Sequence, residues 1–345
     1  MVFDISSLIQ IFFYLSGAFF LAIALTPLLT NYLYAKKLWK KPREEAISGE
    51  KATVYQSLHV KKHRNIPTMA GVLIWGVVAL ITLLFNLDRA GTYLPLFTII
   101  AFGLLGLVDD KINISGNTKV AGLRLIWKLF FTLTLAFIGA WWFYYKLDWT
   151  VIHIPGGTIF GLPYNVDLGA WYIPLFIFVI VATANAVNIT DGLDGLAGGL
   201  LALVFGAYTL IALSQGKIEL ASFTATVVGA VLAYTWFNIY PARFFMGDTG
   251  SLALGATLGV IAMLTNTALV LPIIGLVFVV ETLSVILQLF WKKFFKKKLF
   301  PISPLHHTFE YIGWQEPKIT MRFWVIGAVF CAMGLILALV GMGSY

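Results

Sequence analysis

Acidic side chains and a pair of histidines stand at the ends of long apolar runs in this sequence. Three separate connections carry the carboxylates and a fourth carries the imidazoles: Asp109, Asp110, Asp191, Asp194, Asp248, His306 and His307. The adjacent carboxylates Asp109 and Asp110 repel each other, and a divalent cation removes that conflict. Oxygen ligands favour Mg²⁺, which proteins commonly hold with one or two carboxylates and substrate phosphates. The pattern therefore predicts a Mg²⁺-assisted phosphoryl transfer.

A purely structural role for the aspartate pair is the alternative. Asp109 and Asp110 could cap a helix or balance Lys111. A carboxylate near a bilayer costs several kilocalories per mole unless water, a cation or a partner satisfies it. Because Asp191, Asp194 and Asp248 are expected at the same membrane depth, convergence on one site is favoured.

Two glycine-containing segments could approach a phosphate. Residues 188–199 form a very short connection between two apolar runs. Residues 246–251 place Asp248 between two glycines. Glycine permits a positive φ and close backbone approach, and amides that open a helix can meet a phosphate. Tight helix packing through small residues is the alternative, and both can hold. Asn188, Asp191 and Asp194 have no packing role.

Two further polar groups are less specific. Glu281 and Gln288 share roughly one face of an apolar helix, and we interpret Glu281 as a satisfied structural acid. His306 and His307 could ligate a metal, bind phosphate when charged, or lie in a loop; a histidine metal site needs more ligands.

The composition indicates the elements that position these residues. Apolar residues make up 59% of the 345 residues and charged residues 12%, whereas a soluble protein needs roughly twice that charged fraction. This excludes a cytosolic enzyme, a secreted disulfide scaffold and a disordered chain. The single cysteine, Cys331, excludes a disulfide within the chain. No nucleotide-binding phosphate loop, zinc-protease helix or serine nucleophile elbow is present.

We predict an all-α polytopic membrane protein forming one domain over residues 1–345. Ten apolar runs are long enough, with their flanks, to cross a bilayer. They cover about 9–33, 67–86, 94–108, 125–145, 171–187, 196–213, 219–237, 251–268, 270–290 and 322–342.

The basic residues predict the orientation of these spans. The segments 34–65, 109–128, 238–250 and 291–322 hold 21 of the 24 lysines and arginines. By the positive-inside rule they face the cytoplasm, so both termini lie outside. The charge marks topology and anionic lipid headgroups, and nucleic-acid binding is not expected.

One outer connection predicts a small β-hairpin near 151–160. Val151–Ile154 and Thr158–Phe160 would be its strands, with Pro155–Gly157 in the turn. We expect a lid without chemistry and a surface position for His153.

The motifs, in this order, resemble the phospho-N-acetylmuramoyl-pentapeptide transferase family, within the polyprenyl-phosphate sugar-1-phosphate transferases. The landmarks are 67–69, 109–110, 185–197, 236–251, 280–288 and 304–310. The resemblance implies transfer of phospho-MurNAc-pentapeptide from UDP-MurNAc-pentapeptide to undecaprenyl phosphate, giving lipid I and UMP. It also implies Mg²⁺, a bacterial inner (plasma) membrane with the active site facing the cytoplasm, and a possible homodimer.

The resemblance also assigns roles to residues. Asp248 matches the Mg²⁺ ligand, Asp109 and Asp110 the pair near the lipid phosphate, and His306 and His307 a histidine motif near the donor. These five residues are the expected catalytic residues. The expected substrate-binding residues are Asn188, Asp191, Asp194, Asn238, Phe245, Gly247, Ser251 and Gln288. Lys119 and Lys128 both compete for the position of a lysine that follows the aspartate pair.

Departures and rival interpretations complete the prediction. Thr308 stands where the family has a third histidine, Asn65-Ile66 replace glycine-threonine, and Ala70 replaces a glycine. The nearest rival is the sister group that loads N-acetylhexosamine 1-phosphate onto the same lipid. A secondary transporter is more remote, because such sites lie near the bilayer midplane. Direct attack and a route through a covalent aspartyl-phosphate both stay open.

Overall fold

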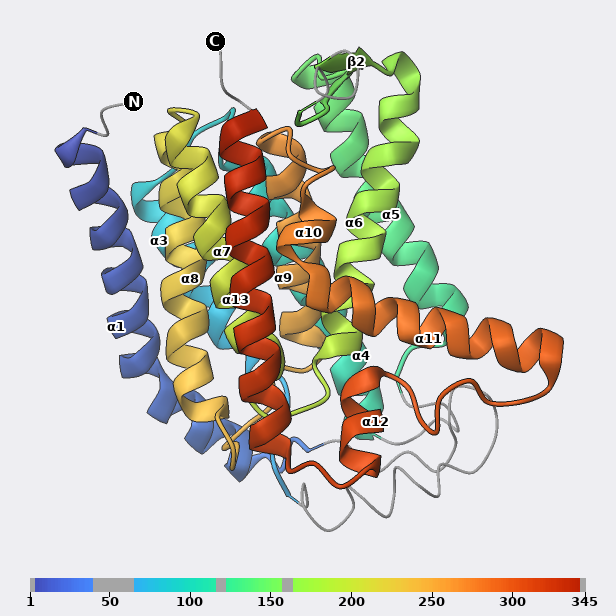
Figure 1. Cartoon of the computed structure of the whole chain (residues 1–345). Helices are drawn as coiled ribbons and strands as arrows, with labels where there is room; N and C mark the ends of the chain where they lie inside the picture. Colours follow the sequence, from blue (N-terminus) through green and yellow to red (C-terminus); the bar gives the residue numbers. More distant parts are fainter. Residues whose placement is uncertain (1–3, 40–64, 116–121, 157–163, 342–345) are drawn as a thin grey trace.

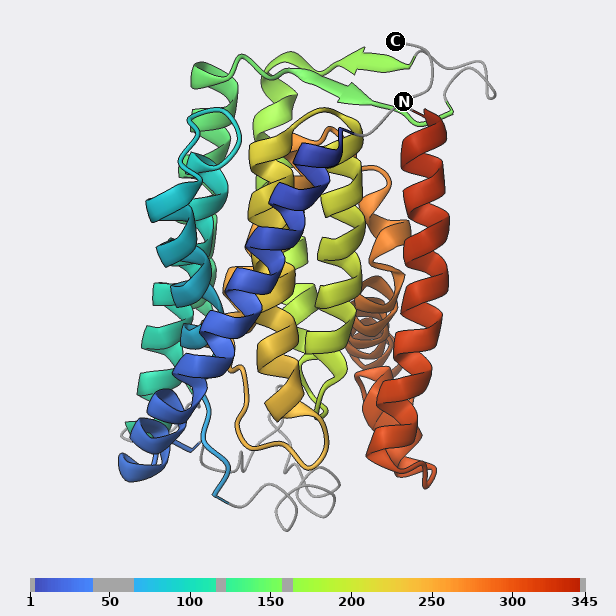
Figure 2. The same cartoon turned by 90° about the vertical axis from the view of Figure 1, so that its left-hand side faces the viewer.

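The protein is a bundle of helices with a small two-stranded sheet at one end (Figures 1 and 2). The computed structural model describes residues 4–39, 65–115, 122–156 and 164–341. Its α-helices are α1 (Ile5–Ala35), α3 (Gly71–Phe85), α4 (Tyr93–Ser115), α5 (Leu125–Lys146), α6 (Tyr172–Thr190), α7 (Leu196–Ser214), α8 (Ile218–Asn238), α9 (Asp248–Leu264), α10 (Leu271–Ile274), α11 (Leu276–Phe295), α12 (Leu305–Tyr311) and α13 (Glu316–Gly341). A short 3₁₀ helix, η2 (Gly169–Trp171), precedes α6.

Seven of the predicted spans correspond to helices whose length and apolar composition suit a membrane crossing. In the described part of the chain these are α1, α4, α5, η2 with α6, α7, α8 and α13. The helices α3 and α9 are apolar but shorter. The chain is thus a mostly helical, multi-pass membrane protein, and the count of ten spans stays a prediction. The start of α1 and the end of α13 lie at the same end of the bundle (Figure 1).

The predicted span 270–290 is not one straight helix. It is divided at Gly275 into the single turn α10 and the longer α11; Pro272 lies in the first turn of α10, where proline is tolerated, and Gly275 has non-helical backbone angles. After the break, α11 runs across the other helices and projects beyond them (Figure 1).

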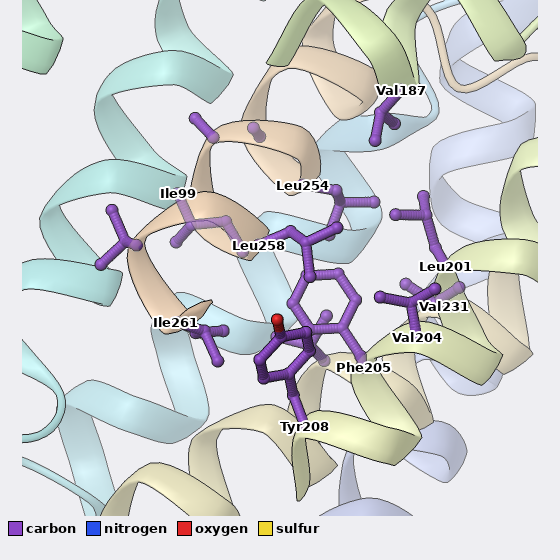
Figure 3. Packing of buried hydrophobic residues seen from close by; sticks show 14 of the residues in the cluster. Ile99, Val187, Leu201, Val204, Phe205, Tyr208, Val231, Leu254, Leu258 and Ile261 are labelled. Atoms are coloured by element: carbon purple, nitrogen blue, oxygen red, sulfur yellow. The ribbon is translucent and has the colours of Figure 1, made fainter. Parts of the chain in front are cut away.

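The core is centred on α9, every residue of which is buried. Figure 3 shows Leu254, Leu258 and Ile261 of α9 packed against Phe205 and Tyr208 of α7. A helix surrounded by others has no lipid-facing side, and its first residue can present a side chain only at its end. That first residue is Asp248.

The hairpin differs from the predicted one. Strand β1 (Val151–His153) is where we expected it, but it pairs antiparallel with β2 (Asn165–Asp167). The predicted second strand, residues 158–160, lies outside the described residues.

His153 is buried, so the expectation of a surface histidine was wrong. Its ring nitrogens lie 3.1 Å from Asn165 Oδ1 and 3.1 Å from the carbonyl oxygen of Gly341, and its ring stacks on Tyr164. The end of α13, far along the chain, covers it.

Candidate active site

The two aspartates of α4 lie beside the start of α9. A Cβ at Gly106 would overlap the backbone oxygen of Asp248, so the lack of a side chain there lets the two helices touch. Asp110 Oδ2 accepts hydrogen bonds from the Thr249 amide (3.0 Å) and hydroxyl (2.8 Å). Asp110 therefore satisfies an amide at the N-terminus of α9, where a negative charge is also favoured by the helix dipole.

Gly247 is required by this contact. Its φ is 71°, and any Cβ there would overlap Asp110 Oδ2 and Thr68 Oγ1. The glycine therefore permits the turn that presents Asp248, as its motif suggested.

Asp109 and Asp248 share one lysine, Lys128 in the first turn of α5. Lys128 Nζ donates a hydrogen bond to Asp248 Oδ2 and lies 3.6 Å from Asp109 Oδ2. Asp109 Oδ1 also accepts a bond from the Leu123 amide (2.7 Å). Of the two lysines considered for this position, Lys128 is at the site, whereas Lys119 lies outside the described residues.

The donor set at this point is a pair of carboxylates. No group of three or more His, Cys, Asp or Glu side chains in the described part of the chain is arranged to hold a metal ion. Mg²⁺ commonly takes one or two carboxylates and completes its shell with water and substrate phosphates. Asp109 and Asp248 already share the positive charge of Lys128, and their two carboxylates are the kind of ligand set that Mg²⁺ takes from a protein.

The end of α6 joins this group. Asn188 Nδ2 donates to Ser251 Oγ (2.8 Å), and Ser251 Oγ donates to the carbonyl oxygen of Gly247 (2.9 Å). Asp191 follows one turn later as the residue that caps α6. The structure thus brings Asn188, Ser251 and Gly247 into one chain of hydrogen bonds.

Asp194 and Asn238 hold two loops together. The Asp194 carboxylate accepts from the Ala242 amide (2.9 Å), and Asn238 bonds the Gly195 amide (3.0 Å) and the Phe244 carbonyl (2.8 Å). Both side chains are buried. Their observed contacts fix the loops that carry Asp191 and Asp248.

Sequence reasoning missed the part that α13 plays. Glu316 Oε1 accepts from the Asp194 amide (2.8 Å), Thr320 Oγ1 donates to the Asp194 carbonyl (3.1 Å), and Trp324 Nε1 donates to the Gly195 carbonyl (3.2 Å). Their spacing of four residues places them on one helix face. The available signal in the sequence was the spacing of Glu316, Thr320 and Trp324, which puts polar groups on one face of an otherwise apolar helix.

The two histidines each pair with a glutamate. His306 Nδ1 lies 2.9 Å from Glu281 Oε2, and the His306 amide donates to Glu281 Oε1 (3.1 Å). His307 Nδ1 lies 2.8 Å from Glu310 Oε2. Glu281 is satisfied, as we interpreted it, but its partner is one of the predicted catalytic residues.

Gly192 brings His306 to the loop that follows α6. A Cβ there would overlap His306 Nε2, so the imidazole lies directly against residue 192. When a carboxylate accepts a hydrogen bond from the Nδ1–H group of a neutral imidazole, Nε2 carries no proton and can act as an acceptor. Thr308, in place of a third histidine, donates to the Ile302 carbonyl and so braces the turn before α12.

Two predicted substrate-binding residues bond the backbone. The Phe245 amide and carbonyl bond Pro67 (2.8 Å) and Ala70 (3.0 Å). The Gln288 amide makes three hydrogen bonds of 2.8–3.0 Å to the backbone of Leu299 and Phe300. Gln288 therefore ties the segment after α11 to that helix.

These groups occupy one end of the bundle, opposite the hairpin (Figure 1). Carboxylates from α4 and α9 meet a lysine from α5 there, and an imidazole from α12 lies against the loop at Gly192. Such a set can bind anionic phosphates and position them for in-line displacement.

This fold and site define a polytopic membrane transferase. Residues 92–266 match the model of glycosyl transferase family 4, and the chain belongs to that family.

Bacterial relatives narrow the class further, because those compared are named phospho-N-acetylmuramoyl-pentapeptide-transferase. The chain is 42% identical over 322 residues to the one from Anoxybacillus flavithermus, covering 92% of this chain and 94% of that protein. It is 41% identical over 324 residues to one from a Geobacillus species, with the same coverage. Identity to the Chloroflexus aurantiacus relative is 42% over 286 residues, covering 79% of this chain and 77% of that protein. The resemblance seen in the motifs is confirmed.

Proposed function

We propose that this chain transfers phospho-MurNAc-pentapeptide from UDP-MurNAc-pentapeptide to undecaprenyl phosphate, forming lipid I and releasing UMP. The observation that carries the proposal is the junction of Asp109, Lys128 and Asp248, formed by three helices in a protein whose relatives bear that enzyme's name. The sister reaction with an N-acetylhexosamine 1-phosphate would need the same junction, so the substrate test below separates the two.

The chemical problem is the approach of two anions. An oxygen of the lipid phosphate attacks the donor phosphorus that bears the sugar, the bond from that phosphorus to the UMP oxygen breaks, and UMP departs. Lys128 would neutralise part of the phosphate charge, and Asp109 would orient the attacking phosphate or take its proton. His306 of α12, held by Glu281 and lying against Gly192, would face the donor.

Asp248 is the proposed Mg²⁺ ligand, with Asp109 beside it. When bound, the ion would stabilise negative charge on the phosphate oxygens. The N-terminus of α9 supplies a positive dipole end at the same place. Lys128, which contacts Asp248 and lies near Asp109, would add a second positive charge for the substrate phosphates.

We also propose the orientation. The end of the bundle that holds the site would face the cytoplasm of a bacterial cell, and both termini would face outward across the inner membrane. The distribution of basic residues supports this, since 21 of 24 fall in segments assigned to that side. A homodimer stays an expectation from the family.

The test is an assay of purified protein with labelled UDP-MurNAc-pentapeptide, undecaprenyl phosphate and Mg²⁺, with UDP-GlcNAc in parallel. Lipid-linked product from the first donor and none from the second is the expected result. Product from UDP-GlcNAc alone would assign the chain to the sister group. Trapping a phosphorylated Asp109 or Asp110 would replace direct attack with a covalent route.

A further inference from the structure

The last turns of α11 and the four residues that follow it combine lysines with large aromatic residues, unlike the membrane-spanning helices. Residues 290–299, which we name the lysine–aromatic arm, contain Phe290, Trp291, Phe294 and Phe295 together with Lys292, Lys293, Lys296, Lys297 and Lys298. The four aromatic side chains are between 36% and 62% exposed. No acidic residue occurs between Glu281 and Glu310, so the arm is a concentrated positive charge.

The two kinds of side chain lie on different sides of the helix. With 3.6 residues per turn, the four aromatic residues fall within an arc of about 140°, and Lys292 and Lys293 leave the helix outside that arc. The long side chain of Lys293 reaches back, so that its Nζ lies 5.8 Å from the ring centre of Phe294. Phe290 lies 4.5 Å from Phe294 and Trp291 4.2 Å from Phe295, between ring centroids, so the aromatic face is continuous. The helix ends at Phe295, Lys296 caps it, and Lys297 and Lys298 follow.

The direction of α11 suits a membrane surface. It crosses the bundle and its far end projects past the neighbouring helices (Figure 1). It is not among the helices suited to a membrane crossing, although its inner half is apolar. A helix with lysines on one side and large aromatic residues on the other is typical of one that lies in the interface plane of a bilayer.

We propose that the lysine–aromatic arm lies in the membrane interface and binds anionic glycerophospholipids. The aromatic face would enter the acyl region, and the lysines would reach up to the headgroup phosphates. In the described part of the chain, Lys293, Lys296, Lys297 and Lys298 form no ion pair with a carboxylate. Lipid phosphates are the complementary charge available at that depth.

The arm is continuous with the part of α11 that serves the site. Glu281 of the same helix holds His306, and Gln288 bonds the backbone of Leu299, at the far end of the arm. Lipid bound at the arm would therefore hold α11 in the orientation that presents Glu281. This inference needs only a membrane-embedded chain and is independent of the transferred sugar.

The test uses the full chain in lipid nanodiscs with a fluorescent label at position 299. Leu299→Cys in a Cys331→Ala background places the label on the arm, and Ile336→Cys places the control label on the exposed face of α13. Phosphatidylglycerol or phosphatidylcholine with brominated acyl chains serves as the quencher. We expect brominated phosphatidylglycerol to quench the label at 299 severalfold more than phosphatidylcholine, and the two lipids to quench equally at 336.

Changing all five lysines to Gln should abolish the preference, whereas changing all five to Arg should preserve it. High salt should weaken the preference in the unaltered arm, which keeps the test valid if the Gln variant fails to fold. Equal quenching by the two lipids at 299 would overturn the proposal. Displacement of brominated phosphatidylglycerol by a trace of undecaprenyl phosphate would also overturn it, since the arm would then be an acceptor-lipid site.

Discussion

The two ends of the bundle use buried polar side chains in different ways. At the hairpin end they mostly bond the backbone: Lys217 Nζ donates to the Leu264 carbonyl (2.7 Å), Gln215 to the Thr265 carbonyl (2.7 Å) and Asn86 to the Glu219 carbonyl (2.9 Å). At the α12 end, side chains such as Asp194 and Gln288 also bond the backbone, but here charged side chains bond each other as well, in the groups Asp109–Lys128–Asp248, Glu281–His306 and His307–Glu310.

This difference distinguishes polar side chains that cap helix ends from charged side chains that are placed to take part in a reaction. A side chain that bonds a terminal carbonyl completes an unsatisfied backbone group and stabilises the fold. Charges held against charges cost desolvation energy and are a poor way to stabilise a fold, but they place reactive groups at fixed distances. We therefore expect changes at the α12 end to reduce turnover, and changes at the hairpin end to alter stability alone.

The largest expected effect is at Asp248. Asp248→Asn removes the charge that we assign to the metal and should lower lipid I formation at least about 100-fold, as loss of one electrostatic group at a transition state does. The matched control is Asp148→Asn at the hairpin end, where φ is 52° and Asn tolerates that backbone. Near-normal turnover in folded Asp248→Asn would remove the metal role.

Gly192→Ala should displace His306. The added methyl group overlaps Nε2, so we expect turnover to fall about 10- to 100-fold, because a misplacement near 1 Å can cost that much. The melting temperature should fall as well, because the methyl group and the imidazole cannot occupy the same space.

Gly206→Ala is the control for this change, since no atom would contact a Cβ at position 206. It should leave both turnover and melting temperature intact or slightly improved. Normal activity in Gly192→Ala would mean that the position of His306 is unimportant.

Glu281→Gln should have a smaller effect. Gln keeps the volume but loses the charge that orients His306, and we expect turnover to fall about 10-fold, the lower end of the range for loss of such an orienting partner. We expect kcat to fall with little change in KM and the pH profile of kcat to move. Glu219→Gln, on the exposed first turn of α8, should change neither. An unchanged pH profile in Glu281→Gln would leave the pair a structural feature.

The smallest effect is at Lys217 and concerns stability. Burial lowers the pKa of Lys217 to about 8 from its ordinary 10.5. Between these values the unfolded chain binds more protons than the folded one, so stability rises with pH there. The free energy of unfolding of the unaltered protein, relative to that of Lys217→Met, should therefore increase by roughly 1–2 kcal/mol between pH 8 and 9.5. The difference in melting temperature between the two proteins should increase with it. Turnover should not differ, and a flat or falling difference would contradict the assignment.

Much of the α12 end could be predicted because charges are restricted in a membrane protein. Charged side chains such as those of Asp109, Asp110 and Asp248 are restricted to regions near the ends of membrane helices. Their depth in the membrane could therefore be predicted from the apolar runs that precede them. Glu316 and Trp324 could not be found in that way, since their partners Asp194 and Gly195 belong to a distant connection. His153 was misjudged for the same reason, because Gly341 covers it.

The sequence by itself determined that the chain is helical, lies in a membrane and carries its acidic motifs near helix ends, since hydropathy and charge act locally along the chain. The expectation that Asp109 and Asp110 end their helix was wrong, because α4 continues past them to Ser115. Only the tertiary structure decided which lysine meets the carboxylates, that Glu281 holds a histidine, and that α11 departs from the bundle at Gly275. Those outcomes depend on close approach of helices far apart in sequence, where a single missing Cβ, as at Gly106 or Gly192, determines which side chains can meet.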